Sequence, residues 1–319
     1  MTNLAQSIGV SLFALLLIAP LDVAFGEVTA SFRYRLANFS GPVLSQCARL
    51  AVDAERNEVY SLNQRANDIR IFDDHGMEIH TFGENFPSAS DIAIADDGNI
   101  FVLSARYQVS TLHLCNYRGE QISEFTLEGA PDEFANFRAD RLAYRRGTLY
   151  LADSNRLAVV LANANGVFQR GYDLAAKLRQ RAAGDERAEK KLEDSSMNGF
   201  DVDSQGNVLF TVASLFSAFR MSANGDLAEF GRPGSGLGKF GVTGGIAADD
   251  MGYVYVADRL RCVVLVFDRN LSFQKEFGYR GGQPSNLIAP NDVAIDGLGN
   301  LYVAQAANRG VSVFKIVRE

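Results

Sequence analysis

The sequence predicts an all-β fold, a six-bladed β-propeller, and three observations carry this prediction. A strand–turn–strand pattern recurs six times along the 319 residues. Each copy alternates apolar and polar positions around a tight turn, as antiparallel hairpins do. Each complete copy continues into two further strands before the next begins. Repeats of about 40–50 residues with four strands are typical of propeller blades, which bury their apolar faces against each other around an axis.

The six copies share a strand, a turn and a second strand. They are RLAVDAERNEVYSL (49–62), DIAIADDGNIFVLS (91–104), RLAYRRGTLYLAD (141–153), GFDVDSQGNVLFTV (199–212), GIAADDMGYVYVAD (245–258) and DVAIDGLGNLYVAQ (292–305). The steps between equivalent positions are 42, 50, 58, 46 and 47 residues, counted from Asp53 through Ala95, Arg145, Asp203 and Asp249 to Asp296. In copies two, four and six the turn carries Gly-Asn, where glycine adopts a positive φ without strain.

Third and fourth strands complete each predicted blade. The third strand ends in Phe, as in IRIFDDHG (69–76) and VVLVFDRN (263–270). The fourth ends in Phe-Gly at Phe82, Phe230 and Phe277. We expect these aromatic side chains, with the aliphatic residues of the second strands, to form the core between blades.

The last copy, residues 290–315, stops after its third strand. Near the start of the chain, FRYRLANFSG (32–41) alternates apolar and polar residues and ends much as the other fourth strands do. We expect it to pair with Val311 to Val317 and to close the ring, because an unpaired edge strand invites association with other chains.

One helical insertion is predicted between blades 3 and 4. Residues 173–195 are rich in helix formers, and Leu174, Leu178 and Ala182 form an i, i+4 stripe. Gly184 is expected to divide the segment. Its balanced charges favour a solvent-exposed helical insertion over one face of the propeller. The alternative is that it forms a lid or a partner-docking helix over the channel mouth.

Residues 1–26 are predicted to be an export signal outside the propeller. Ile8 to Pro20 is a short apolar run, and the small residues Ala24 and Gly26 suit cleavage before the single propeller domain, 27–319. An uncleaved N-terminal anchor is the alternative. The mature domain is expected in the periplasm, at the cell surface or secreted, with no membrane span.

Charge and cysteine usage exclude some classes of partner. The net charge of −7 disfavours nucleic acid, because phosphate-binding surfaces are basic. Cys47, Cys115 and Cys262 lie in separate segments without a CxxC pattern, so neither a zinc knuckle nor a haem attachment site is indicated. The three are expected to be small buried side chains, with one disulfide plus a free thiol as the alternative.

These residues resemble the NHL repeat family, whose pattern is approximately P-x-G-I-A-V-D-x-x-G-N-I-Y-V-A-D-x-x-N-x-R-I-x-V-F-D-x-x-G. Copies five and six match it well, copy one fairly well, and copies two to four more loosely. In copy five, Ile246, Asp249, Gly252 and Tyr253 to Asp258 follow the pattern. The resemblance covers about residues 49–315 and implies the propeller fold. It implies no single activity, because NHL propellers include protein-binding, RNA-binding and enzymatic members.

Propellers usually bind ligands at the channel mouth, where the innermost strands begin. The position of Asp292 corresponds in the other copies to Arg49, Asp91, Arg141, Gly199 and Gly245. The candidate ligand-binding residues, taken from this position and the one before it, are Arg49, Asp91, Asp140, Arg141, Asn198, Asn291 and Asp292. Either the arginines and aspartates pair with one another, or the arginines hold a small polar or anionic ligand, since a guanidinium donates two hydrogen bonds to a carboxylate.

Metal chemistry finds little support in this ring. Resemblance to six-bladed calcium lactonases would require an oxygen cage, to which Asn198, Asn291, Asp91 and Asp292 could contribute. Two arginines in the same ring oppose a cation. The zinc-dependent amidating lyase that shares the NHL fold needs several inner histidines, whereas this chain has three, His75, His80 and His113, all outside the predicted ring.

No catalytic residues, metal site or cofactor are therefore predicted, with calcium kept as an alternative. We interpret the chain as an exported NHL-type propeller that serves as a binding scaffold through its faces and channel mouth. The expected partner is an envelope or extracellular protein, or a small polar ligand. The alternative is a metal-assisted hydrolase or lyase of the lactonase or amidating-lyase type.

Overall fold

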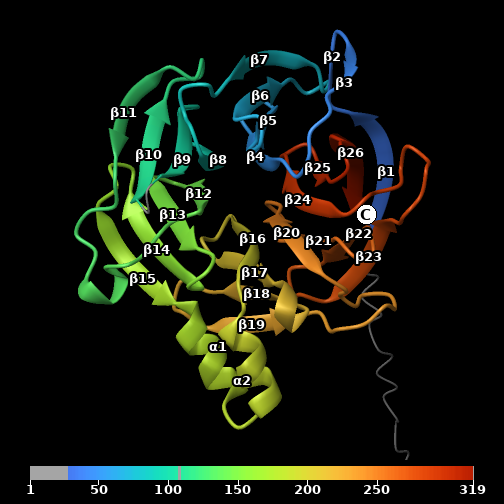
Figure 1. Cartoon of the computed structure of the whole chain (residues 1–319). Helices are drawn as coiled ribbons and strands as arrows, with labels where there is room; N and C mark the ends of the chain where they lie inside the picture. The colour runs from blue at the N-terminus through green and yellow to red at the C-terminus, as the bar shows by residue number, and fades with distance from the viewer. Residues whose placement is uncertain (1–27, 107–108, 319) are drawn as a thin grey trace, which may run out of the picture.

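The computed structural model describes residues 28–106 and 109–318. They form six antiparallel four-stranded sheets, which Figure 1 shows arranged around a central axis. The predicted six-bladed β-propeller is therefore confirmed. A small additional pair, β2 with β3, lies outside the blades.

Three blades precede the helical insertion. Blade 1 contains β4 (Arg49–Asp53), β5 (Glu58–Asn63), β6 (Asp68–Phe72) and β7 (Glu78–Phe82). Blade 2 contains β8 (Ala89–Ile94), β9 (Ile100–Arg106), β10 (Val109–Cys115) and β11 (Gln121–Phe125). Blade 3 contains β12 (Arg141–Arg145), β13 (Thr148–Asp153), β14 (Ala158–Asn163) and β15 (Phe168–Asp173).

The other three blades follow the helical insertion. Blade 4 contains β16 (Met197–Val202), β17 (Val208–Val212), β18 (Ser217–Met221) and β19 (Leu227–Phe230). Blade 5 contains β20 (Thr243–Ala248), β21 (Val254–Asp258), β22 (Val263–Phe267) and β23 (Phe273–Gly278). Blade 6 contains β24 (Pro290–Ile295), β25 (Asn300–Gln305), β26 (Val311–Arg318) and β1 (Val28–Arg35).

The apolar core lies between neighbouring blades, as the repeat predicts. Tyr60 and Ile69 of blade 1, for example, pack in one buried cluster with Ile92, Ile100 and Val102 of blade 2. Each sheet is apolar on both faces because each has a neighbour on both sides. Stacking around the axis therefore provides the burial that a single isolated blade would lack.

The ring is closed by the two ends of the described chain. β1 pairs antiparallel with β26, from Val28 opposite Arg318 to Arg35 opposite Ser312. Phe32 packs edge-to-face on Phe314, with ring centroids 5.8 Å apart. β1 is thus the fourth strand of blade 6, and the predicted pairing with the C-terminal strand is present.

The predicted limits of this strand, 32–41, were wrong at both ends. β1 begins at Val28 and ends at Arg35, with a register shift between Phe32 and Tyr34. The chain then turns through β2 (Ala37–Asn38) and β3 (Gly41–Pro42), which pair as a small hairpin. Phe39 lies at the hairpin tip and is fully exposed. It therefore does not close a blade as the other Phe-Gly pairs do.

The insertion between blades 3 and 4 is a pair of helices, α1 (Leu174–Ala182) and α2 (Glu186–Glu193). The Asp173 side chain caps α1 by accepting a hydrogen bond from the Ala176 N–H at 2.8 Å. Gly184 separates the helices with a φ of 87°. Leu174, Leu178 and Leu192 are buried against blades 3 and 4.

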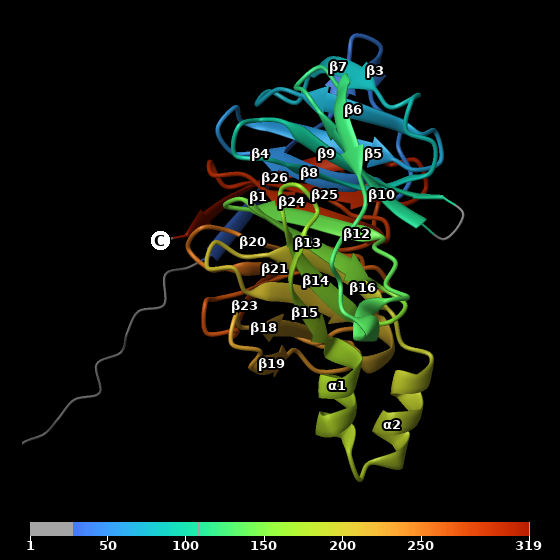
Figure 2. The ribbon, with the colours of Figure 1, turned by 90° about the vertical axis from the view of Figure 1, so that its left-hand side faces the viewer.

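Figures 1 and 2 show this helical pair projecting beyond the rim of the ring. Two short 3₁₀ turns, η1 (Asp132–Phe134) and η2 (Ala213–Leu215), complete the helical content. Neither α1 nor α2, nor any other helix in the described ranges, has the length and apolar character needed to cross a bilayer. The predicted export signal, 1–26, lies outside the described residues.

Two glycines let the innermost strands of blades 4, 5 and 6 approach closely. A Cβ at Gly199 would lie 2.8 Å from the Gly245 Cα. A Cβ at Gly245 would lie 2.6 Å from the Asp292 Cα and would also overlap the Asp292 carboxylate. Side chains at these two ring positions are thus excluded by the packing of β16, β20 and β24.

We predict that removing residues 28–35 strongly destabilises the propeller. The deletion exposes the edge of β26 and loses the burial of Val28 and Phe32, worth about 1.5–3 kcal/mol for a fully buried side chain. We expect the melting temperature to fall by roughly 10 °C, since about 2–4 °C is lost per kcal/mol in a domain of this size. Circular dichroism melting measures this. Phe39→Ser, at the exposed hairpin tip, is the matched control and should melt like the wild type; equal melting of the deletion would contradict ring closure by β1.

Gly245→Ala should destabilise the ring by about 1–3 kcal/mol, because its methyl group must displace Asp292 or the β24 backbone. Gly297→Ala is the matched control, since a Cβ there meets nothing within 4 Å. Urea unfolding compares the two variants through their midpoints. Equal midpoints would show that β20 and β24 are not packed as closely as described.

Candidate functional site

The ring predicted at the start of the innermost strands lines the axial channel. Arg49 and Arg141 begin β4 and β12, and Asp91 and Asp292 are the third residues of β8 and β24. All four line a channel cavity of about 140 Å³. The structure therefore brings together the two arginines and two of the aspartates that the sequence singled out.

Buried carboxylates join neighbouring blades across this channel. Asp292 Oδ2 of blade 6 accepts a hydrogen bond from the Leu50 N–H of blade 1 at 3.0 Å. Asp91 Oδ2 of blade 2 accepts one from the Leu142 N–H of blade 3 at 2.9 Å. Asp201, which the sequence analysis did not single out, makes the same kind of bond from blade 4 to blade 5.

The Asp201 bond runs from the Ala248 N–H to Oδ2 over 3.1 Å. Three alternate junctions of the ring, 6 to 1, 2 to 3 and 4 to 5, are thus bridged by a buried carboxylate. Asp91 and Asp292 were predicted as ligand groups, and the structure shows them engaged in holding blades together.

Burial changes the proton affinity of these groups. It raises the pKa of Asp91 to about 6, while Arg49, Arg141 and the Leu142 N–H oppose the shift. Burial also raises the pKa of Asp292 and of Asp201. Burial, and then the positive charge of Arg49, lower the pKa of Arg141. Burial in the channel therefore raises the proton affinity of all three carboxyl groups above that of an exposed aspartate.

The two arginines are only partly neutralised. Arg49 Nη1 lies 3.8 Å from Asp292 Oδ1, which is an ion pair but longer than a hydrogen bond. Arg141 Nη1 donates to the Asp140 carbonyl at 2.8 Å and to Asp140 Oδ2 at 3.1 Å. The Nε of Arg141 is buried without a partner. The predicted pairing of arginines with aspartates is present, and it leaves guanidinium donors uncommitted.

Above the channel lies a second cavity, which we call the mouth cavity. Its volume is about 210 Å³, and its lining residues are Cys47, Arg49, Gln64, Arg141, Asn198, Gly244, Arg259 and Asn291. Four of the seven predicted residues are among them. Asp91 and Asp292 lie deeper, in the channel, and Asp140 lies beside the mouth cavity, where it fixes Arg141.

Asp140 and the two asparagines are anchored to the backbone. Asp140 Oδ1 accepts a hydrogen bond from the Ser154 N–H at 2.9 Å, and Asn198 Oδ1 accepts one from the Ala213 N–H at 2.9 Å. Asn291 Nδ2 donates to the Ala48 carbonyl at 3.1 Å, whereas its Oδ1 is buried without a partner. These bonds hold the amide groups rigidly at the mouth.

The sequence analysis missed Gln64 and Arg259. Each is the first residue after the second strand of its blade, in loops that reach the mouth from β5 and β21. Gln64 Nε2 donates to the Ser90 carbonyl at 2.6 Å. Arg259 is exposed, and its guanidinium has no hydrogen-bond or ion-pair partner among the described residues. Their shared position in the repeat was the signal that could have revealed them.

All three cysteines are free thiols in the structure. Cys115 and Cys262 are buried, as predicted, whereas Cys47 is half-buried and lines the mouth cavity. The expectation that all three are buried was therefore wrong for Cys47. The disulfide alternative finds no support among these residues.

The helical pair contributes nothing to the mouth cavity, whose lining contains no residue of α1 or α2. Both helices instead line a separate groove of about 420 Å³ beside blade 3. In this conformation the helices do not act as a lid over the mouth. Their buried residues, Leu174, Leu178 and Leu192, indicate a packing role against blades 3 and 4.

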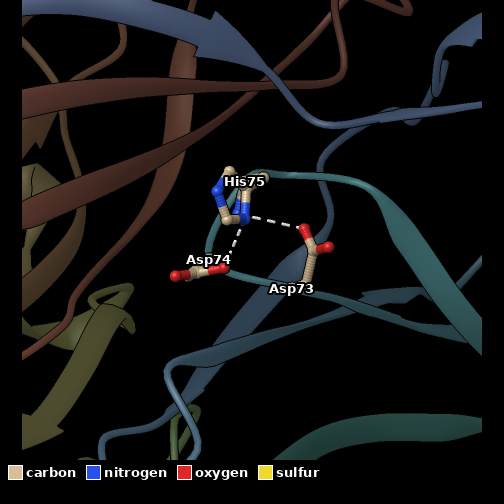
Figure 3. A group of neighbouring side chains, drawn as sticks. All are labelled: Asp73, Asp74 and His75. Carbon is tan, nitrogen blue, oxygen red and sulfur yellow. Dashed lines mark hydrogen bonds and ion pairs between the residues drawn. The ribbon is translucent and has the colours of Figure 1, made fainter.

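One further cluster of potential metal ligands lies at the turn between β6 and β7. It contains Asp73, Asp74 and His75, shown in Figure 3, and is the one such group found among the described residues. Asp73 Oδ1 already accepts hydrogen bonds from the backbone N–H groups of His75 and Met77, at 3.0 and 2.8 Å. His75 Nδ1 lies 2.6 Å from Asp74 Oδ1. The cluster is thus explained as a turn stabilised by its own side chains.

No protein-family model matches the chain, and no curated protein matches its sequence. Solved structures share its fold. A protein of unknown function from Bacteroides thetaiotaomicron is 14% identical, with a TM-score of 0.64 over 91% of this chain and 77% of that one. A catalytically inactive histidine-to-alanine variant of virginiamycin B lyase from Staphylococcus aureus, with quinupristin, is 13% identical, with a TM-score of 0.55 over 85% of this chain and 80% of that one.

A luciferin-regenerating enzyme is 11% identical, with a TM-score of 0.58 over 91% of this chain and 95% of that one. These identities are low, so the likeness establishes the fold alone. The chain is a six-bladed β-propeller that resembles propeller enzymes and proteins of unknown function in its overall arrangement.

Proposed function

We propose that this chain is an exported NHL-type β-propeller that binds a ligand at its channel mouth and holds it without chemical change. The observation that carries the proposal is the lining of the mouth cavity. It combines three arginines with three amide side chains, all projecting into one small cavity. Such a surface offers many hydrogen-bond donors for recognition.

The same lining offers little for catalysis. Among the described residues, no histidine, aspartate or glutamate lines the mouth cavity. Cys47 is the one potential nucleophile there, and it has no general base beside it within the lining. Nucleophilic catalysis requires such a base or a comparable activating group, so the cavity favours binding.

A metal-assisted hydrolase or lyase finds less support. Asp91 and Asp292 already accept backbone hydrogen bonds from the next blade, and Arg49 and Arg141 line the same channel. A calcium site would require six to eight oxygen ligands, and a nearby guanidinium would repel the ion. The inactive virginiamycin B lyase variant carries a histidine-to-alanine substitution. No histidine of this chain lines the channel or mouth cavity.

The NHL resemblance and the N-terminal segment support the remaining parts of the proposal. The repeat pattern covers about residues 49–315, and the apolar run from Ile8 to Pro20 followed by small residues fits an export signal. The mature protein is placed by this proposal in the periplasm, at the cell surface or outside the cell. Its partner is then an envelope or extracellular protein, or a small polar ligand.

We predict that a component of the cell-envelope fraction protects Cys47 from alkylation by N-ethylmaleimide. Cys47 lines the mouth cavity, while Cys115 and Cys262 are buried and serve as internal controls that should stay unmodified in the folded protein. Mass spectrometry of the reduced, full-length protein measures labelling at each thiol. Native mass spectrometry of the protected sample then identifies the bound species, which should be recovered chemically intact.

Protein already alkylated at Cys47 is the matched control and should retain no envelope component at the mouth. Either of two results would contradict the proposal. One is the failure of every envelope fraction to protect Cys47. The other is hydrolysis of lactones or esters, with stoichiometric bound metal measured by elemental analysis and with turnover lost on alkylation of Cys47.

A further inference from the structure

The mouth cavity presents positive charge from three directions. Arg49 comes from β4, Arg141 from β12 and Arg259 from the loop after β21. Among the described residues, the other polar side chains of its lining are three amides and the Cys47 thiol. A ligand complementary to this surface must carry negative charge and accept several hydrogen bonds.

Several guanidinium N–H groups of these arginines make no hydrogen bond within the described part of the protein, so they remain available to a ligand. Arg259 has no side-chain partner among the described residues, and the 3.8 Å ion pair of Arg49 is not a hydrogen bond. Arg141 keeps one buried Nε–H unpaired and uses Nη1 alone for Asp140. A planar anion accepts two parallel hydrogen bonds from one guanidinium, and a carboxylate has that geometry.

The volume limits what can enter. The cavity of about 210 Å³ is small beside the roughly 300–1,000 Å³ that is typical of sites for drug-sized ligands. It therefore admits a carboxylate with a short chain behind it and is too small for a long polyanion. Such a group is found on a small organic acid or at the C-terminus of a peptide.

The buried carboxylates below would respond to an arriving anion. Asp91 faces Arg49 from β4, Arg141 from β12 and Asp292 from β24, and these are the charged groups that act on it. The arginines now offset the charges of Asp91 and Asp292. A ligand carboxylate on the same arginines would add a negative charge beside Asp91 and Asp292, and a proton on a channel carboxyl would offset it.

We propose that the mouth cavity is a carboxylate-binding site that takes up a proton together with its ligand. This inference rests on the proposed function and adds the chemical class of the ligand and the coupling. Because the two equilibria are linked, protonation of the channel carboxyl increases the affinity for the ligand, and bound ligand increases the affinity of that carboxyl for a proton. The mouth would therefore bind carboxylates more tightly in mildly acidic surroundings.

The direction and window of the pH effect follow from Asp91. Burial raises its pKa to about 6 in the unliganded protein, and a bound carboxylate would raise it further. Below pH about 6 the channel is protonated with or without ligand, so affinity stops rising there, and it falls at lower pH once the ligand carboxylate itself takes up a proton. As pH rises above about 6 the unliganded channel loses its proton first, and affinity falls.

The class of ligand is tested by protection of Cys47 in the full-length protein. The probes are succinate and N-acetyl-triglycine, which represent a small acid and a peptide C-terminus, with N-acetyl-triglycine amide and inorganic sulfate as controls. We expect one or both carboxylates to slow labelling by N-ethylmaleimide at least about tenfold at saturation, and the amide and sulfate to have little effect. The probe that protects at the lower concentration identifies the source.

Two matched arginine variants of blade 5 locate the site. Arg259→Gln should raise the carboxylate concentration for half-protection by about tenfold, the usual order for one charge-assisted contact. Arg269→Gln removes an exposed arginine from the β22–β23 turn, at the opposite face of the blade, and should leave that concentration unchanged. Both positions are exposed, so neither variant threatens folding.

The coupling is tested by pH. The concentration of carboxylate for half-protection should rise about three- to tenfold between pH 6 and pH 8 in the wild type, judged at each pH against labelling without ligand. The Asp91→Asn variant should still bind the carboxylate, but its concentration for half-protection should be the same at pH 6 and pH 8. Because that variant replaces a buried residue, calorimetry on the wild type in two buffers of different ionisation enthalpy provides an independent measure, and should show proton uptake at pH 7.

Several results would overturn the inference. Equal protection by sulfate, or by the amide, would remove the carboxylate assignment. Protection without proton uptake or pH dependence would remove the coupling. Protection by an envelope component but by neither carboxylate would refute the inference and leave the proposed function standing, whereas protection by nothing would refute both.

Discussion

The backbone N–H groups on the axial edge of the inner strands set the constraint on which the rest of this propeller depends. An inner strand has a neighbouring strand on one side only, so its other edge faces the channel, where no strand of the described chain pairs with its N–H groups. The chain meets this need at three alternate junctions with the carboxylates of Asp91, Asp201 and Asp292, which accept from the next blade. Each carboxylate also links two blades across a junction that has no strand pairing.

That solution creates the chemistry of the mouth. Buried carboxylates are costly without nearby positive charge. Arg49 and Arg141 supply it from the two blades whose backbone N–H groups donate hydrogen bonds to Asp292 and Asp91. On the other side of the ring the equivalent positions are Gly199 and Gly245, because the inner strands there approach too closely for side chains. At this ring position the charged side chains therefore come from blades 6, 1, 2 and 3, whereas blade 5 supplies Arg259 from the loop after β21. The recognition surface is asymmetric although the fold is a near-regular repeat.

The fold could be predicted from sequence because every repeat contains the same pattern of apolar positions, and these positions pack between neighbouring blades. Even copies three and four, which depart from the NHL pattern, form four-stranded blades, since strand alternation and turn position matter more than particular residues. The limits of the closing strand could not be predicted in the same way. Alternation from Phe32 to Leu36 continued the pattern, but a register shift after Phe32 and the buried Leu36 turn the chain out of the sheet. Such irregularities depend on contacts with β26, which lie far away in sequence.

The candidate site was predictable only as far as the repeat aligns equivalent positions. That alignment identified Arg49 and Arg141, but it could not distinguish a carboxylate that holds two blades together from one that faces a ligand, because Asp91 would occupy the same position in both cases. Arg259 was missed because only the ring position and the residue before it were compared between copies, whereas Arg259 follows the second strand of its blade. The uncertain role of Asp91 and the omission of Arg259 have one physical cause. The repeat position of a residue predicts which side chains come together, but the extent of their burial decides what they do. Where burial is complete the charge serves the backbone, and where it is partial the same charge remains available to a ligand.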